Sequence, residues 1–466
     1  MKPRRCRFLI LCGTALCVVW IVFQTVMTVA NRINFVPLAE KRIVVLNTKS
    51  EYVKTLKEYF KNTRKRIVWR KKTNRPYDII KQKELLKHPI IVTLPSSAFE
   101  ENQFFQEIVK DDVLPTMHLD RLGIISYLPS FETEFVVQFI NMLYGSWKFI
   151  NKNRQSLLSY KELRNSLRVD LLTFCYADMC PFLPKECKKL TTSTGIDSNT
   201  RPSCYYIEEN NQVDFDYPVL NSFIMFKKKE IRKILKPYKY LLRTDVDVFL
   251  GPALWFTRPT RAIAVGNGAY CDSFNKKRLM SIARKLKMVH RGVHCVGSTW
   301  YGKRNILIYA ANKTLSLTKY IYLNEFSSNL KGIEDINFSG SQKYGVWKRW
   351  WKPVSLLYAA ELTLNDIIPD FSNEYKMNLD TSSCSGKAAV KQTHIPCYHS
   401  KCEFQKFNFT DNLKAIMDTS SKVDSSVSRN LIKYSRDLDI TKMDVSEYAT
   451  YIAWNSVHKY MFKNGL

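Results

Sequence analysis

The chain has 466 residues, of which 45% are hydrophobic and 13% aromatic, and these values are typical of a folded globular protein rather than a disordered one. Its length allows one large domain or two ordinary domains. The net charge of +30 indicates an anionic partner, which on charge alone is a nucleic acid, a membrane surface or a small anion.

The N-terminus contains a candidate membrane span. Residues from Phe8 to Ala30 form an uncharged run of 23 residues, which is long enough to cross a bilayer. Four basic residues precede it and favour a cytoplasmic N-terminus: Lys2, Arg4, Arg5 and Arg7. We therefore predict a cytoplasmic tail at 1–7 and a signal anchor at 8–30. A cleaved signal peptide ending near Ala30 is the alternative. In either case the rest of the chain enters the secretory lumen, which argues against a nucleic-acid partner.

The cysteines fit an oxidising compartment. Three of them, Cys6, Cys12 and Cys17, lie in or beside the predicted anchor. The remaining nine are expected to form mainly structural disulfides, with at least one left over because the number is odd, and their connectivity stays open. These nine are Cys175, Cys180, Cys187, Cys204, Cys271, Cys295, Cys384, Cys397 and Cys402. Asn312, Asn337 and Asn408 match the pattern of glycosylation acceptors.

Residues 31–88 are dense in lysine and arginine and are predicted to form a basic stem, and 89–466 to form the folded body. Ile90 to Leu94 and Arg121 to Leu128 are predicted strands. A helix is expected to begin at the N-cap Ser130 and to end at Gly145, with a further strand from Val169 to Tyr176. This order predicts an α/β fold with a mostly parallel sheet flanked by helices. Nucleotides bind at the carboxyl ends of such strands, so Tyr127 is a candidate nucleotide contact.

The centre of the chain carries two carboxylates. Tyr240 to Leu250 is predicted to be a buried strand that Gly251-Pro252 terminates, and the two-residue period places Asp245 and Asp247 on one side of it. Two carboxylates close together repel each other unless a cation lies between them. Their hard oxygen ligands suit Mg²⁺ or Mn²⁺, ions that commonly hold substrate phosphates. The alternative is a chance Asp-x-Asp in an exposed loop.

Further elements are expected after and before this segment. Helices are predicted at 221–235, 276–288, 299–326 and 355–368, and a strand at 262–266. Glu334 and Asp335 lie in a predicted loop. Three tryptophans close to cations at 346–351 suit either sugar stacking or core packing. Glu361 and Asn365 share one helical face, which is polar because it meets either solvent or substrate.

Two histidines stand in the late segment Val390 to Cys402. His394 ends a short extended stretch, and His399 follows five residues later. In a chain that already carries two metal-suited carboxylates, His394 is a candidate third metal ligand. A structural histidine is the alternative.

These features together resemble the metal-dependent GT-A glycosyltransferases of the Golgi. The residues that carry the resemblance are the N-terminal anchor, the basic stem and the segment from Arg243 to Leu250, while the segment His394 to Lys401 is similar to a late histidine segment of some members. The resemblance implies that Asp245, Asp247 and His394 hold Mn²⁺ or Mg²⁺. It further implies that Lys401 contacts the diphosphate of a nucleotide-sugar donor, and Arg243 is a further candidate for binding the donor.

For catalysis, the resemblance implies an acidic residue as a base in inverting members, and Glu334-Asp335 is similar to the pair that supplies it. Glu361 is a further candidate. The implied enzyme is a hexosyltransferase-like protein of the Golgi or ER membrane, single-pass and type II, acting on a glycan, glycoprotein or glycolipid. Inversion or retention stays open. The sequence departs from the pattern at Pro396, where a glycine is expected.

Two other hypotheses use the same residues. Asp245-x-Asp247 also resembles the first motif of haloacid-dehalogenase phosphatases, but that motif normally lies on the first strand of its domain. A non-catalytic, membrane-anchored carbohydrate-binding or scaffold protein with a glycosyltransferase-like fold is the second alternative. Metal-dependent hydrolysis of a nucleotide sugar discriminates between the enzyme and the scaffold.

Overall fold

The computed structural model describes residues 120–129, 133–158, 166–197, 201–209, 220–259, 261–326, 349–372, 379–397, 402–417, 430, 433–435 and 438–463. The predicted tail, anchor and stem lie outside these residues, as does the predicted strand at 90–94. Among the described helices, none combines the length and the apolar character needed to cross a bilayer.

A seven-stranded sheet forms the centre of the molecule, with the strand order β3-β4-β2-β1-β5-β8-β7. The strands are β1 (Arg121–Leu128), β2 (Arg168–Tyr176), β3 (Lys188–Lys189), β4 (Cys204–Glu209), β5 (Tyr240–Arg243), β7 (Ile263–Asn267) and β8 (Val296–Lys303). The five strands from β3 to β5 in this order are parallel, and β8 runs antiparallel to both β5 and β7. The prediction of a mostly parallel sheet is therefore confirmed.

The strand order reverses direction at β1. From β1 the chain proceeds to β2 and β4 on one side, and then returns to place β5 on the other side of β1. A reversal of this kind leaves a crevice outside the carboxyl ends of the two neighbouring strands, and ligands of open α/β sheets bind there. Tyr127 at the end of β1 and the segment that follows Arg243 in β5 both lie at this edge.

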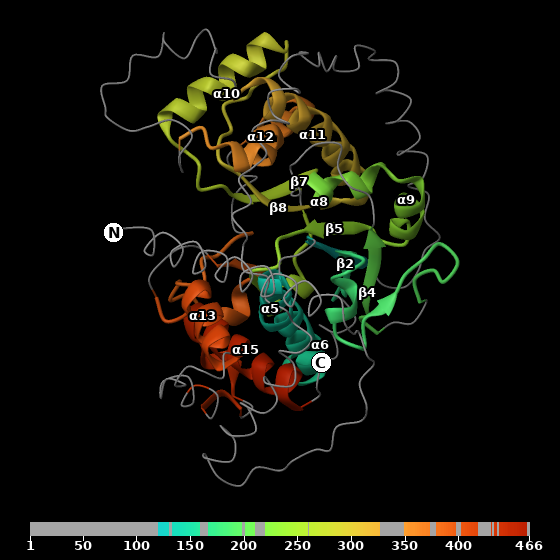
Figure 1. The fold of residues 1–466 in the computed structure, drawn as a ribbon, viewed down its shortest axis with the longest axis vertical. Coiled ribbons are helices and arrows are strands. Elements are labelled where there is room, and N and C mark those ends of the chain that lie inside the picture. The colour runs from blue at the N-terminus through green and yellow to red at the C-terminus, as the bar shows by residue number, and fades with distance from the viewer. Residues whose placement is uncertain are drawn as a thin grey trace, which may run out of the picture.

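Helices cover both faces of the sheet (Figure 1). Those on one face are α5 (Thr133–Gln138), α6 (Gly145–Leu157), α13 (Lys406–Met417) and α15 (Val445–Ser456), and those on the other are α8 (Asn221–Ile224), α9 (Lys229–Leu235), α11 (Arg304–Asn324) and α12 (Ser355–Ile367). Successive strand residues alternate between the two cores: Leu171 packs in the first and Leu172 in the second, and both are fully buried. This burial on both faces is typical of parallel sheets. A third cluster joins α12 to α10 (Ser273–Lys285).

The carboxylate segment differs from its prediction as a single strand. It forms β5, a connecting segment from Thr244 to Asp247, and β6 (Val248–Leu250), which belongs to a separate two-stranded sheet with β9 (His394–Pro396). The chain leaves the large sheet at Thr244 because β6 pairs with a strand near the C-terminal end rather than with β1 or β8. The late histidine segment is thereby brought to the carboxylates.

Two predicted helices are also wrong in part. The segment 299–326 begins as strand β8 and becomes helix α11 only at Arg304, because its first residues fill the place between β5 and β7. The segment 221–235 is divided into α8, a 3-10 turn and α9. By contrast, β1, β2 and α12 agree with their predicted ranges to within a residue or two.

Gly145 does not end its helix. It is helical, with φ of −57° and ψ of −48°, and α6 continues from it to Leu157. A Cβ at this position would lie 2.1 Å from Oγ and 2.9 Å from Cβ of Ser456 in α15. The glycine is therefore required by the close packing of two helices rather than by a chain reversal.

The disulfide prediction is confirmed among the described residues. Four pairs form: Cys175–Cys180, Cys187–Cys204, Cys271–Cys295 and Cys384–Cys402. Cys397 is free and buried, which accounts for the odd number. Each pair joins cysteines no more than 24 residues apart. The disulfides therefore close short loops and do not link distant parts of the chain.

Candidate functional site

The two acids of the Asp-x-Asp leave the core while the residue between them enters it. The side chains of Asp245 and Asp247 are 45% and 22% exposed, whereas Val246 is only 4% exposed. The acids lie directly after β5, at the crevice where the strand order reverses. They are therefore neither enclosed in an apolar interior nor far out on a solvent loop.

Asp245 is positioned by the sheet itself. Nη1 of Arg243 lies 3.2 Å from one carboxylate oxygen, and the hydroxyl of Ser298 in β8 donates to the other. The guanidinium of Arg243 is buried and also donates to the Ser298 carbonyl at 2.5 Å and to the Ser222 hydroxyl at 3.2 Å. Arg243 is thus fixed by the core and in turn holds the carboxylate of Asp245 in place. Its role in binding the donor stays a prediction.

Asp247 pairs with a lysine that no sequence motif indicated. The ammonium of Lys406, at the start of α13, contacts a carboxylate oxygen of Asp247. Burial lowers the pKa of Lys406, but the negative charge of Asp247 outweighs it and raises the pKa, so Lys406 is a fixed cation at the site. The Cys397 amide also donates to the Asp247 carbonyl at 3.2 Å.

His394 lies next to Thr244, the residue before Asp245. Both of its ring nitrogens have hydrogen-bond partners. Nε2 is 2.7 Å from the Thr244 hydroxyl, and Nδ1 donates to Asp380 at 2.7 Å. The ring is fully buried. The structure thus brings His394 next to the segment that carries the two acids. A role as metal ligand stays a prediction, and it requires one of these two hydrogen bonds to be given up.

Asp380 ties this network to the neighbouring strand. Its second oxygen accepts the Asn267 amide of β7 at 3.2 Å. A Cβ at Gly266 would lie 2.0 Å from the same oxygen, so the close approach needs a glycine there. Nothing in the local pattern around Asp380 singled it out, because its partner His394 is 14 residues away.

Tyr127 lies at the carboxyl end of β1, the strand that pairs with β5. Burial raises the pKa of its hydroxyl to about 12, against a hydrogen bond with Asn221 that lowers it, so the phenol is protonated at neutral pH. The position is the one expected of a nucleotide contact, and that role stays a prediction.

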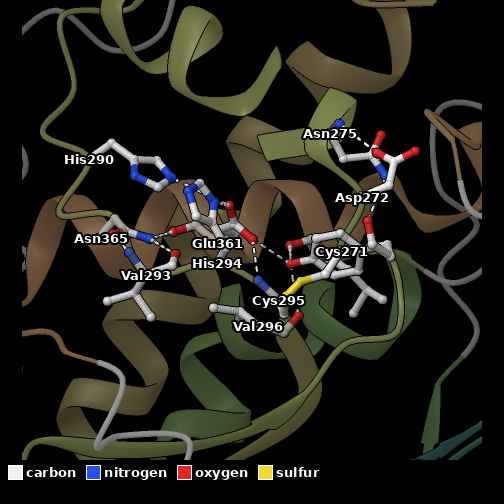
Figure 2. Close-up of a disulfide and its surroundings, with 12 residues drawn as sticks. Cys271, Asp272, Asn275, His290, Val293, His294, Cys295, Val296, Glu361 and Asn365 are labelled. Atoms are coloured by element: carbon white, nitrogen blue, oxygen red, sulfur yellow. Dashed lines mark hydrogen bonds and ion pairs between the residues drawn. A yellow bond between two sulfur atoms is a disulfide. The ribbon is translucent and has the colours of Figure 1, made fainter. Parts of the chain in front are cut away.

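Glu361 has a set of partners of its own, among them His290, His294 and Cys295 (Figure 2). It is fully buried in α12. One oxygen is 3.3 Å from Nε2 of His290 and 2.6 Å from Nδ1 of His294, and the other accepts the Tyr270 hydroxyl at 2.9 Å and the Cys295 amide at 2.7 Å. Burial raises the pKa of this carboxyl, but the hydrogen bonds from the two histidines outweigh it and lower the pKa, so Glu361 is ionised.

A catalytic role of Glu361 stays a prediction. The polar face of α12 does not meet solvent, one of the two alternatives that its pattern suggested. It holds a loop. Asn365 is also fully buried and accepts the amides of Arg291 at 2.9 Å and Val293 at 3.2 Å. The loop from 286 to 295 follows α10, and its shape is irregular: Lys287, Gly292 and Cys295 all have positive φ. The helix supplies the polar partners that this irregular backbone needs.

Several predicted site residues lie outside the described part of the chain: Glu334, Asp335, His399 and Lys401. Of the three tryptophans at 346–351, Trp350 and Trp351 are described, and Trp350 is the buried one. It is 3% exposed and stacks on Tyr358 with ring centroids 4.6 Å apart. Core packing is therefore its use.

Comparison with known proteins gives a family without an assigned function. A family model described as "Domain of unknown function (DUF7164)" matches residues 116–465. This chain belongs to that family. The DUF7164 match spans every described element of the fold. No curated protein matches the chain.

Among solved structures, the chain is similar to a glycosyltransferase involved in the glycosylation of the major capsid of PBCV-1. The identity is 9%, the match covers 63% of this chain and 98% of that chain, and the TM-score is 0.28. A TM-score of this size does not by itself establish a shared fold.

Proposed function

We propose that this DUF7164 protein is a metal-dependent glycosyltransferase with a glycosyltransferase-like fold. It transfers a sugar from a nucleotide-diphosphate donor to a glycan, glycoprotein or glycolipid. We further propose that residues 8–30 anchor it as a single-pass type II protein in the Golgi or ER membrane, with the body in the lumen. The substrates, the anchor and the compartment are all part of the proposal.

One observation carries the proposal: two partly exposed carboxylates stand at the point where the order of a parallel sheet reverses. Ligands of open α/β sheets bind there, and nucleotides are common among them. Each acid is ion-paired within the fold, Asp245 with Arg243 and Asp247 with Lys406, and Asp245 nevertheless keeps a surface open to a further ligand. Here 45% of the Asp245 side chain is exposed to solvent.

The carboxylate oxygens of Asp245 and Asp247 are hard donors of the kind that suits a divalent cation, and in the described structure they and His394 have not converged into a ligand cluster. Asp245 and Asp247 would hold Mn²⁺ or Mg²⁺ through carboxylate oxygens, with His394 as a proposed third ligand. When bound, the ion supplies electrostatic stabilisation to the charge that develops on a departing diphosphate. The protein's own contribution is to hold the acids in place through Arg243 and Ser298 and to add the charge of Lys406 beside them.

A thermal-shift panel tests the proposal. The full chain is heated with UDP, GDP, CDP or ADP, each with and without Mn²⁺. We expect one nucleoside diphosphate to raise the melting temperature in the presence of Mn²⁺ only. At a ligand concentration 100 times Kd the stabilisation is about 2.7 kcal/mol. The Asp247→Asn variant should lose the shift and also the metal-dependent hydrolysis of the matching nucleotide sugar.

Glu230→Gln is the matched control, because Glu230 is an exposed acid in α9 on a different part of the surface. It should retain the shift and the hydrolysis. No shift with any nucleotide, together with no hydrolysis of any donor, would refute the enzyme and favour the carbohydrate-binding scaffold.

A further inference from the structure

In the described part of the chain, four acidic residues are buried when the exposure of the whole residue is considered. One of the four differs from the others in its partners. Three are paired with a lysine or an arginine: Asp170 with Arg168, Glu209 with Lys228, and Glu325 with both Arg278 and Lys285. Glu361 has two histidines instead. A buried carboxylate is costly unless a positive charge or a metal accompanies it. Imidazole, unlike the side chains of lysine and arginine, carries no permanent charge, and it is a common ligand of metal ions.

The atoms around Glu361 converge as metal ligands do. Nε2 of His290, Nδ1 of His294 and a carboxylate oxygen of Glu361 all lie within 4.8 Å of one another. The distance of 3.3 Å from Glu361 to His290 is long for a hydrogen bond. It equals the separation of about 3.3 Å between two ligands that each lie about 2.05 Å from a tetrahedral zinc ion.

The surroundings hold these three side chains in place. The second oxygen of Glu361 is fixed by the Tyr270 hydroxyl and the Cys295 amide, and Cys295 is itself tied to Cys271 by a disulfide (Figure 2). Cys295 has a φ of +67°, a conformation that is rare outside glycine and that turns its amide toward Glu361. Partners of this kind orient metal-binding side chains in proteins.

We propose that His290, His294 and Glu361 bind a transition-metal ion of the zinc type, and that this ion fastens the loop from 286 to 295 to α12. Two imidazoles and one carboxylate form a donor set that suits Zn²⁺, with water as a fourth ligand, whereas the all-oxygen pair Asp245 and Asp247 suits Mn²⁺ or Mg²⁺. The ion places a permanent positive charge beside Glu361.

Metal binding requires two local changes. The 2.6 Å contact between Glu361 and His294 must open by about 0.7 Å to admit an ion, and Nδ1 of His294 must give up the proton that it donates to Glu361, with the neutral ring carrying its proton on Nε2 instead. Nδ1 of His290, which accepts the Gly292 amide at 3.1 Å, must carry the proton once Nε2 is bound to metal, so the ring turns away from that amide. Both changes involve the loop from 286 to 295, in which Gly292 is exposed and has open space around it.

The test measures metal directly and does not depend on the transferase proposal. The full chain is purified without chelators or a histidine tag, and its metal content is determined by mass spectrometry. We expect about one zinc ion per chain. Chelation should lower the melting temperature, and Co²⁺ added to the stripped protein should give the visible absorption of a tetrahedral site.

His290→Gln and His294→Asn are the variants of choice, because each keeps an N–H donor near the ring nitrogen that it replaces. Each should bind zinc at least tenfold more weakly while its circular dichroism is unchanged. Asp247→Asn should keep the zinc. X-ray absorption at the zinc edge of the unsubstituted protein should show two imidazole ligands, and this measurement decides the matter if the variants do not fold.

The inference is overturned if the purified chain contains no zinc and binds neither Zn²⁺ nor Co²⁺ after stripping. It is also overturned if both histidine variants retain the metal, or if the X-ray absorption spectrum at the zinc edge shows no imidazole ligand. In those cases Glu361 is satisfied by hydrogen bonds alone.

Discussion

At the scale of single residues, the imidazole of His394 joins two oxygens beneath the carboxylate segment. One belongs to Thr244, the residue after β5, and the other to Asp380, whose side chain is only 4% exposed. The ring thereby connects the two-stranded sheet of β6 and β9 to the end of the large sheet. Whatever its relation to a metal, it fixes the backbone from which Asp245 and Asp247 extend.

We therefore expect His394→Ala to lower the free energy of unfolding by about 3 kcal/mol, because Asp380 loses its partner in a nearly dry environment. Urea denaturation measures this change. Titration of the folded variant with Mn²⁺, followed by electron paramagnetic resonance, tests the ligand role separately. Unchanged stability together with a large loss of Mn²⁺ affinity would contradict the structural role.

The carboxylate pair and His394 could be found from the sequence because their types and their places in the apolar pattern are unusual. Lys406 and Asp380 could not. Each acquires its meaning from partners in other segments: Lys406 is 159 residues from Asp247, and Asp380 is 14 residues from His394 and 113 from Asn267. The two histidines near Glu361 offered a signal, since His290 and His294 are four residues apart and next to a cysteine, but their partner lies on a helix 67 residues later.

At the scale of elements, Gly145 shows how a helix is extended by packing. A residue that ordinarily ends helices is here enclosed between α6 and α15, and Ser456 fills the space that a side chain would need. The strands β1 and β2 and the helix α12 were predictable because their apolar patterns agree with their final environment. The segment 299–326 was not, because the antiparallel pairing of β8 with β5 and β7 outweighs its local helical pattern.

Gly145→Ala should therefore destabilise the protein, by about 1–3 kcal/mol, although alanine is the better helix former. The added methyl group forces α6 away from α15. Chemical denaturation measures the change, and Gly386→Ala serves as the control because Gly386 is exposed and no atom lies within 4 Å of the place that an added methyl group would take. A Gly145→Ala variant as stable as the control would show that the two helices separate at little cost.

At the scale of the whole molecule, four disulfides form among the described residues, and disulfides of this kind are typical of proteins from oxidising compartments. The uncharged run at 8–30 and the basic residues before it predict how the chain enters that compartment. The two observations are independent, since the disulfides come from the folded body and the anchor from the sequence alone.

We expect the body to resist protease added to intact microsomes that contain the full chain, and to be digested once detergent opens them. Replacing Lys2, Arg4, Arg5 and Arg7 by serine should expose part of the population, because the charge that retains the N-terminus in the cytoplasm is gone. Immunoblotting of the body measures protection. Digestion in sealed vesicles of the unsubstituted chain would place the body on the cytoplasmic side.

The pairing of β6 with β9 also determines how late in synthesis the carboxylate site can fold. Phe249 and Ile395 are partners in that small sheet, and Lys406 reaches Asp247 from still further along the chain. A ribosome must therefore release most of the polypeptide before the acids at 245 and 247 acquire their final surroundings. A nascent chain stalled before position 394 would carry both acids but not the strand and the lysine that position them, so premature termination anywhere in the first five-sixths of the message should yield an inert product.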